Sequence, residues 1–210
     1  GQLQRNGRTP ERAQCLDRRA VPFGWTVRLC IPAGLPGRGR GGPQEKGREM
    51  KQILMIGTGG TIASEMTEAG LVPGMSGAEF LQYIPSVEKL CQVDCLQVCN
   101  IDSTNMTPSH WLAIAQAVET HYETYDGFVI CHGTDTLAYT AAALSYLIQD
   151  SPKPIVLTGS QKPIHMDITD SKTNLLDSFT VACDGRLPGV TVVFGGAVIL
   201  GTRARKTYSK

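Results

Sequence analysis

The stretch ILMIGTGGTIAS, residues 53–64, joins a run of four apolar side chains to a glycine-rich turn that holds two threonines. A short apolar run that ends at glycine is typical of a buried strand rather than a helix. The turn lies at the carboxyl end of this strand, where open α/β sheets place their functional groups. The stretch therefore predicts a fold class and also the place to look for a site.

Similar apolar runs alternate with helical segments along the rest of the chain. The first helical segment opens with Thr107 as the predicted N-cap and Pro108 as the first helical residue. Nearly continuous apolar strands that alternate with helices predict an α/β fold with an open, mostly parallel sheet and helices on both faces. The expected strands cover 53–57, 95–101, 127–133, 154–160, 190–196 and 197–201, and the expected helices cover 107–125, 136–150 and 171–185.

Three of these strands end in polar loops with the sequences GTGGTIAS, NIDSTNMTP and CHGTDT. Parallel strands would bring all three loops to one rim of the sheet. The first loop does not fit a phosphate-binding motif, because no lysine follows Gly60 and the sixth position counted from Gly57 is Ile62. A nucleotide site is therefore disfavoured.

The same loops fit the display of a nucleophile better. Thr61 and Thr134 each follow a glycine, and Asp135 follows Thr134. Glycines leave backbone N–H groups uncovered beside the hydroxyls. On one rim, the two Gly-Thr pairs would place two hydroxyls across a small cleft. The alternative is a pair of ordinary strand-to-helix turns with threonine caps. The polar sequence DST at 102–104, in the loop between them, weakens that alternative.

Several segments resemble the bacterial-type L-asparaginase family, and most closely its cytoplasmic type I branch. They occur in the family's order and at its spacing, and the resemblance covers nearly everything from Met50 to the end. It implies that residues 50–210 form the family's N-terminal catalytic domain. The matching segments are TGGTIAS at 58–64, DSTNMTPSHW at 102–111, YDGFVICHGTDT at 125–136, HGTDTLAYTA at 132–141, PIVLTGSQKPI at 154–164 and GTRARK at 201–206.

The resemblance implies an amidohydrolase that needs no metal and no cofactor. The family hydrolyses the side-chain amide of L-asparagine, and often that of L-glutamine more slowly, to ammonia and the acid. By motif, Thr61 is the expected nucleophile, which forms an acyl-enzyme that water then hydrolyses. The expected second catalytic group is Thr134, Asp135 and Lys206, and the expected substrate-binding residues are Gly60, Asp102, Ser103, Gly133 and Asp135.

The residue types suit this chemistry. A threonine hydroxyl is a weak nucleophile until another group accepts its proton. Lys206 would accept it through Thr134 if burial favoured the neutral amine, whereas a nearby Asp135 carboxylate would favour the charged lysine. Asp135 would otherwise bind the α-ammonium of the substrate. Backbone N–H groups in the loops would stabilise the oxyanion.

Two departures from the family pattern stand out. Many members have a tyrosine on the segment after the first motif, where this chain has Leu71 in TEAGLVPG. Leucine cannot share a proton, so either the activation differs or another residue, such as Tyr83, takes its place. The chain also stops at Lys210, without the smaller C-terminal domain that helps to close the site in the family. We therefore expect weak or no activity from this polypeptide alone, and a homodimer or homotetramer at full length.

Two other functions stay open. The amidase subunit of an archaeal-type tRNA-dependent amidotransferase also resembles asparaginases, although it carries an extra folded domain before this region. A non-catalytic protein that holds an amino acid in the same pocket is the second alternative, and Leu71 favours it. The presence of Thr61, Thr134, Asp135 and Lys206 together argues against mere binding.

Residues 1–49 differ in composition from the rest of the chain. They carry ten Lys or Arg and four Asp or Glu, a net charge of +6, against −5 for residues 50–210. This basic, glycine-rich segment predicts disorder or a non-native extension, with a nucleic-acid-binding arm or a targeting peptide as alternatives. We otherwise expect a small-molecule substrate, no nucleic-acid partner and no membrane span.

The seven cysteines indicate free thiols in a reducing, cytoplasmic compartment. Cys91, Cys95 and Cys99 recur every four residues, but no second pair of ligands follows at zinc spacing. We expect them to be small buried side chains, with Cys95 and Cys99 on one face of the strand at 95–101.

Overall fold

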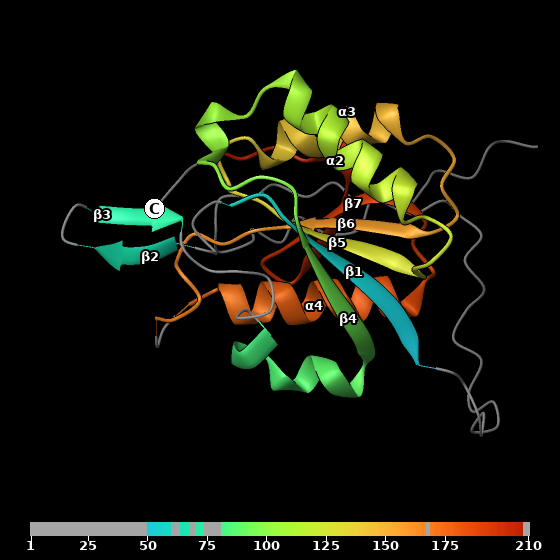
Figure 1. Ribbon diagram of the computed structural model, residues 1–210, viewed down its shortest axis with the longest axis horizontal. Coiled ribbons are helices and arrows are strands. Elements are labelled where there is room, and N and C mark those ends of the chain that lie inside the picture. Colours follow the sequence, from blue (N-terminus) through green and yellow to red (C-terminus); the bar gives the residue numbers. More distant parts are fainter. Residues whose placement is uncertain (1–49, 60–63, 68–69, 74–80, 167–168, 208–210) are drawn as a thin grey trace, which may run out of the picture.

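The computed structural model describes residues 50–59, 81–166 and 169–207, together with the backbone of two short strands at 64–67 and 70–73. Six strands form one sheet in the order β4-β1-β5-β6-β7-β8 (Figure 1). All neighbouring pairs are parallel except β7 and β8, which are antiparallel. The strands are β1 (Lys51–Gly57), β4 (Cys91–Gln97), β5 (Gly127–Cys131), β6 (Pro154–Thr158), β7 (Gly189–Phe194) and β8 (Ala197–Leu200).

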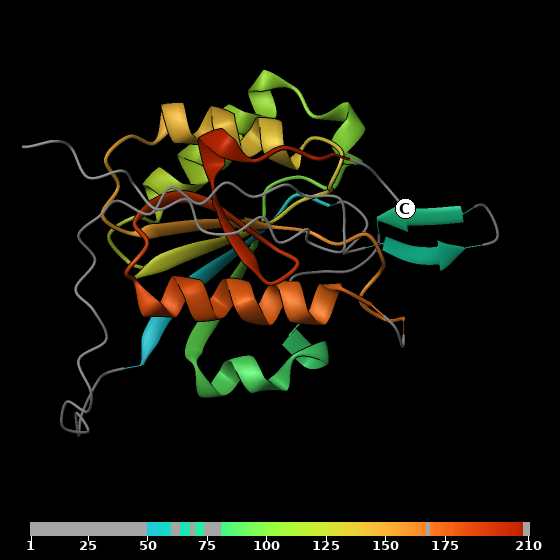
Figure 2. The same cartoon turned by 180° about the vertical axis from the view of Figure 1, so that it is seen from behind.

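Helices cover both faces of this sheet, as the sequence predicts. Helices α2 (Pro108–Thr120) and α3 (Leu137–Leu147) lie on one face, and α4 (Ser171–Asp184) lies on the other with the 3-10 turn η2 (Pro85–Lys89) (Figures 1 and 2). The N-cap of α2 is Thr107, with Pro108 as the first helical residue, and α4 ends at Asp184 with Gly185 as its C-cap, at φ of 68°. The open, mostly parallel α/β sheet is confirmed.

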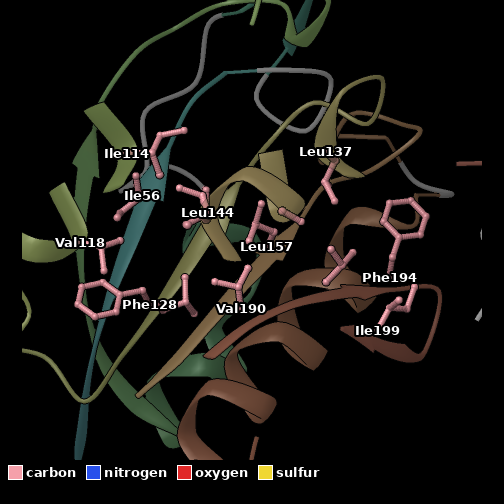
Figure 3. Packing of buried hydrophobic residues seen from close by; sticks show 14 of the residues in the cluster. Ile56, Ile114, Val118, Phe128, Leu137, Leu144, Leu157, Val190, Phe194 and Ile199 are labelled. Atoms are coloured by element: carbon pink, nitrogen blue, oxygen red, sulfur yellow. The ribbon is translucent and has the colours of Figure 1, made fainter. Parts of the chain in front are cut away.

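Alternate residues of each strand enter two separate apolar cores. In β1, Ile53 and Met55 face α4, whereas Leu54 and Ile56 face α2 and α3. Figure 3 shows the second core, in which Leu137 and Leu144 of α3 and Ile114 and Val118 of α2 point at the strands. Each fully buried aliphatic side chain contributes about 1.5–3 kcal/mol. Two-sided burial explains why the central strands read as continuous apolar runs.

The edge strand β4 lies earlier than the sequence predicts, at Cys91–Gln97 instead of 95–101. Its seven residues pair in register with the seven residues of β1, from Lys51 opposite Cys91 to Gly57 opposite Gln97. Cys99 therefore lies beyond the strand. Only Cys91 of this group is buried, Cys99 is half-buried and Cys95 is exposed, so the expectation of three buried cysteines is wrong. The physical reason is the edge position, which leaves much of β4 uncovered by the described residues.

A second, two-stranded sheet follows the first motif. Strands β2 (Ser64–Thr67) and β3 (Gly70–Pro73) pair in antiparallel fashion, with Leu71 opposite Met66, and they project away from the main sheet (Figure 1). A short 3-10 turn, η4 (Gly201–Arg203), packs against α3 near the end of the chain. Within the described part of the chain, each helix is too short or too polar to cross a membrane.

Candidate active site

The loop between β5 and α3 carries the second expected catalytic pair. Thr134 and Asp135 lie three and two residues before the first turn of α3, which begins at Leu137. Thr134 is 6% exposed, whereas the side chain of Asp135 is 53% exposed. The Thr134 hydroxyl is thus buried, and the Asp135 carboxylate lies at the surface.

Lys206 reaches this loop from the far end of the sequence. Its Nζ donates to Thr134 Oγ1 at 2.8 Å and to Asp135 Oδ1 at 2.7 Å. The side chain of Lys206 is only 15% exposed, so the contact with Thr134 is partly shielded from water. Residues 72 positions apart in sequence are therefore joined as expected. An amine that donates to both oxygens is placed to stabilise negative charge on Thr134.

The loop after β4 lies beside this group. Asp102 is the N-cap of the 3-10 turn η3 (Ser103–Asn105), and its Oδ1 accepts from the backbone N–H of Thr104 at 2.8 Å and from its hydroxyl at 2.9 Å. Thr136 Oγ1 donates to the carbonyl of Ser103 at 2.7 Å, which ties η3 to the Thr134 loop. Asp102 is exposed, whereas Ser103 is only 3% exposed.

The first motif leaves β1 at the same rim. Thr58 donates to the carbonyl of Cys131 through its N–H at 3.1 Å and its hydroxyl at 3.0 Å, and the N–H of Ile101 donates to the Thr58 carbonyl at 3.1 Å. Gly59 has φ of 93°, and a Cβ there would lie 2.6 Å from Ile101 backbone atoms, so only glycine fits. The described start of the first loop, at Thr58 and Gly59, thus meets the other two polar loops at one rim.

The expected nucleophile Thr61 and its neighbour Gly60 lie outside the described residues, and their placement stays a prediction. Tyr83, the suggested replacement for the missing tyrosine, is 37% exposed. Its ring lies 6.0 Å from the Nζ of Lys172, near the start of α4. Among the described residues, His, Cys, Asp and Glu side chains form no group of three that could hold a metal ion.

Comparison with known proteins shows the family of this chain. The family profile described as "Asparaginase, N-terminal" matches residues 52–210. The chain belongs to the asparaginase family. It is 43% identical over 159 residues to an L-asparaginase of Thermococcus kodakarensis, with 75% of this chain and 48% of the relative covered. The chain thus spans about half the length of such curated relatives.

A solved structure and a second class of relative extend the comparison. The crystal structure of L-asparaginase I from Vibrio cholerae matches with a TM-score of 0.71 at 34% identity, covering 77% of this chain and 49% of that chain. A subunit of the glutamyl-tRNA(Gln) amidotransferase from Metallosphaera sedula is 37% identical over 161 residues, covering 73% of this chain and 37% of the relative. The asparaginase family therefore includes chains with different named activities.

Behind the Thr134 loop, this asparaginase-family chain holds a buried histidine that sequence reasoning missed. His132 is 0% exposed, and its Nδ1 lies 2.7 Å from the Gly133 carbonyl, which can only accept, so Nδ1 carries the proton. Trp111 Nε1 donates to Thr140 Oγ1 at 2.9 Å, which leaves the Thr140 hydroxyl to donate to His132 Nε2 at 2.9 Å. Burial lowers the pKa of His132 to about 4, against the opposing effect of the Gly133 carbonyl. The ring is neutral and fixed in one tautomer.

A second buried cluster holds the loop after β6. The Asp170 carboxylate accepts from the backbone N–H groups of Gln161 at 2.9 Å and Lys162 at 3.1 Å. Asn174 of α4 donates to the carbonyl of Gly159 at 2.9 Å and accepts from the N–H of Gly195 at 2.9 Å. One side chain thus fixes the ends of β6 and β7. Nothing in the sequence alone marks Asn174, because its role depends on strands that lie side by side in space.

Proposed function

We propose that this chain carries the catalytic half of an asparaginase-type amidohydrolase, which hydrolyses the side-chain amide of L-asparagine to L-aspartate and ammonia. The observation that carries the proposal is the contact of Lys206 with both Thr134 and Asp135, at the rim where the described parts of the three polar loops meet. Membership of the asparaginase family supports it. L-Glutamine is the expected second substrate.

The proposed reaction uses Thr61 as nucleophile. Its hydroxyl oxygen attacks the amide carbon, the C–N bond breaks, and ammonia leaves with a proton while an ester forms on Thr61. Water then attacks the ester, which releases aspartate and restores the hydroxyl. Each attack places negative charge on the former carbonyl oxygen, which backbone N–H groups of the rim are suited to stabilise.

The role of Lys206 follows from its two acceptors. Its Nζ donates to Thr134 Oγ1 and forms an ion pair with the Asp135 carboxylate, and an ammonium has no lone pair with which to accept a proton. Lys206 therefore acts on Thr134 by stabilising negative charge on Oγ1. This leaves the hydroxyl proton of Thr134 free to point away from Lys206, toward a water or a substrate group. The proposal thus gives Lys206 an electrostatic role, rather than the role of first proton acceptor.

Substrate binding is proposed at the exposed carboxylates of the rim. Asp135 uses Oδ1 for Lys206, and Asp102 uses Oδ1 for Thr104, so among the described contacts each carboxylate keeps a second oxygen for an α-ammonium group. Gly60 and Gly133 are proposed to offer backbone groups. Ser103 is almost fully buried, so its hydroxyl would contact the substrate only from the floor of the site.

Ammonia release from L-asparagine and from L-glutamine tests the proposal. From residues 1–210 alone we expect at most weak release, and we expect any release to depend on Thr61, with Thr61→Ala inactive and Thr67→Ala, a threonine of β2, unchanged. Binding of L-asparagine by calorimetry without ammonia release would instead support a protein that only holds the amino acid. The same assay on a longer chain that includes the second half found in its relatives tests whether residues 1–210 suffice.

The amidase subunit of a tRNA-dependent amidotransferase is the second candidate function, and the similarity to the Metallosphaera sedula amidotransferase chain favours keeping it. Such a subunit would supply ammonia from an amide to a partner protein that holds tRNA. Ammonia release that rises at least tenfold when a partner subunit and tRNA are added would support it. Release that is unchanged by both would support the asparaginase alone.

Assembly and location follow the same family inference. We propose a cytoplasmic protein that forms a homodimer or homotetramer when the whole chain is present. Light scattering on the purified protein measures the oligomeric state, and cell fractionation measures the location.

A further inference from the structure

The loop that carries Thr134 has a buried anchor on its upstream side, at the carbonyl of Gly133. The Nδ1–H of His132 donates to this carbonyl at 2.7 Å, and both residues are buried. The Gly133 carbonyl and the Thr134 N–H belong to one planar peptide group, so a bond that fixes the carbonyl also fixes the start of Thr134. The Thr134 hydroxyl lies 2.8 Å from the Nζ of Lys206. His132 is therefore one peptide group away from the central contact of the site.

His132 is itself held by elements outside the loop. Its backbone N–H donates to the carbonyl of Thr158, at the end of β6, at 2.8 Å. Its Nε2 accepts from the hydroxyl of Thr140 in α3 at 2.9 Å, and that hydroxyl accepts from the Nε1–H of Trp111 in α2 at 2.9 Å. The direction of the ring is thus set by α2, α3 and β6, which pack together in one apolar core.

A second anchor holds the downstream side of the same loop. Thr136 Oγ1 donates to the carbonyl of Ser103 at 2.7 Å. Thr134 and Asp135 lie between this anchor and the anchor at Gly133. The upstream bond is buried, and a buried hydrogen bond is stronger than an exposed one because its surroundings screen it less. The two anchors together limit how far the residues between them can move.

We propose that His132 is a positioning residue, whose Nδ1–H holds the Gly133–Thr134 peptide group in the orientation that keeps the Thr134 hydroxyl on Lys206. The two helices behind the ring hold it in turn. His132 is 0% exposed, so it acts through Gly133 and not on the substrate. The effect on the reaction rests on the proposed function, because the position of Thr134 matters there only if Thr134 takes part.

Two substitutions separate the two hydrogen bonds of the ring. His132→Asn places a side-chain N–H group near the position of Nδ1, so it still donates to Gly133 but does not reach Thr140. His132→Gln places its amide near the position of Nε2, so it still accepts from Thr140 but does not donate to Gly133. Each variant loses the ring and one hydrogen bond, so we expect similar losses in the free energy of unfolding. Positioning predicts that the two variants nevertheless differ at Thr134.

Methyl NMR on threonine-labelled protein measures this difference as the order parameter of the Thr134 methyl group, without any need for turnover. We expect a clear fall in His132→Gln and a value close to that of the wild type in His132→Asn. Thr191, a buried threonine of β7, is the internal control and should keep its value in both. Tyr122→Phe removes a hydroxyl that lies 2.7 Å from the hydroxyl of Ser151, and it is the matched control for one hydrogen bond lost elsewhere.

Ammonia release from L-asparagine supplies the second readout, on whichever of the shorter and longer chains turns over. In His132→Gln, kcat should fall about tenfold, the effect of one lost hydrogen bond, with KM within about twofold. In His132→Asn, kcat should stay within about threefold of the wild type, because the bond to Gly133 is kept. If the wild type of both lengths releases no ammonia, the proposed function fails, and the order parameter of Thr134 still decides whether His132 positions it.

Three results would overturn the proposal. The first is an equal fall of the Thr134 order parameter, or of kcat, in His132→Asn and His132→Gln. The second is a Thr134 order parameter that stays at the wild-type value in both variants or falls equally in Tyr122→Phe. The third concerns Thr140→Val, which removes the donor to Nε2 and takes the place of His132→Gln if that variant does not fold. We expect a smaller fall there, and an unchanged value would show that α3 does not hold the ring.

Discussion

Lys206 is the residue on which the proposed chemistry depends most directly. It is 15% exposed and donates to Thr134 and Asp135 at 2.8 and 2.7 Å. Removing one donor aimed at developing negative charge typically costs a factor of about 10² to 10³ in kcat. We predict that Lys206→Met lowers kcat for ammonia release by about that factor, with a much smaller change in KM.

Two variants separate charge from position at this site. Lys206→Arg keeps the charge but not the compact donor geometry, so we expect kcat between that of the wild type and Lys206→Met. Arg205→Met removes an exposed cation next in sequence and should leave kcat within about twofold. If Arg205→Met and Lys206→Met lose activity equally, the general positive charge of the segment matters and the contact with Thr134 does not.

His132 makes a prediction about stability and pH. Burial lowers its pKa from 6.5 to about 4, so the unfolded chain binds a proton between these values while the folded protein does not. The stability is therefore complete above about pH 6.5 and falls as the pH drops toward 4. Between pH 7.5 and 5 this group removes about 2 kcal/mol of the free energy of unfolding. Urea unfolding of the wild type and His132→Gln measures it, and equal pH dependence in the two proteins would refute the assignment.

The Trp111–Thr140–His132 chain makes a prediction of its own. Trp111→Phe keeps the ring but removes the N–H that fixes the direction of the Thr140 hydroxyl. We expect a loss of about 0.5–1.5 kcal/mol in the free energy of unfolding, the usual value of one hydrogen bond. Chemical denaturation measures it. Trp111→Phe combined with Thr140→Val should lower the free energy of unfolding by less than the sum of the two single losses, because the two residues share one interaction. Strictly additive losses would contradict a shared hydrogen bond between Trp111 and Thr140.

Some residues of the candidate site were predicted from the sequence, and others were not. Lys206, Thr134 and Asp135 were predicted from a family resemblance, and the described contacts bring them together. His132 and Asn174 were missed, because a buried polar residue acquires its role from partners that only the folded chain brings near. His132 is next to the motif residue Gly133, so the only signal was its position beside a candidate site.

At the scale of elements, the ends of β5 and β6 are held unusually close. A Cβ on Gly159 would lie 2.3 Å from the carbonyl oxygen of His132, a backbone atom that cannot move without shifting β5. A Cβ on Gly57 would also lie 2.3 Å from its nearest atom, but that atom is the side-chain oxygen of the exposed Gln97. The same distance therefore has different consequences at the two positions.

We predict that Gly159→Ala lowers the free energy of unfolding by about 2–3 kcal/mol, the usual cost of overpacking, and disturbs the Thr134 loop. Gly57→Ala should cost less than about 1 kcal/mol, because the Gln97 amide swings into solvent. Chemical denaturation measures both, and ammonia release reports the loop. Equal losses in the two variants would show that the approach of β6 to His132 is not the controlling contact.

The elements themselves were largely predictable from periodicity. Five of the six observed strands of the main sheet lie almost fully at their predicted ranges, since burial on both faces gives continuous apolar runs. The edge strand β4 was displaced by about four residues, because its exposed positions carry Gln92, Asp94 and Gln97 and no apolar run marks its start. Pairing with β1 decides its ends, and pairing between strands distant in sequence cannot be read from the strand alone.

At the scale of the whole molecule, the character of the sequence changes at Met50. The family match begins at residue 52, and β1 begins at Lys51, where all seven of its residues already pair with β4. The described residues of both apolar cores all follow Met50. The charge changes at the same point, from +6 before Met50 to −5 after it.

We predict that residues 50–210 fold without residues 1–49, with a thermal unfolding midpoint within about 2 °C of that of the 210-residue chain, because the shorter protein keeps every described residue of both apolar cores. The shorter protein should bind an anion-exchange resin at pH 8, since its net charge falls from +1 to −5. Differential scanning calorimetry on both proteins measures the midpoint. A midpoint lower by about 5 °C or more in the shorter protein would show that the first 49 residues contribute to the folded domain, and the boundary at Met50 would then be wrong.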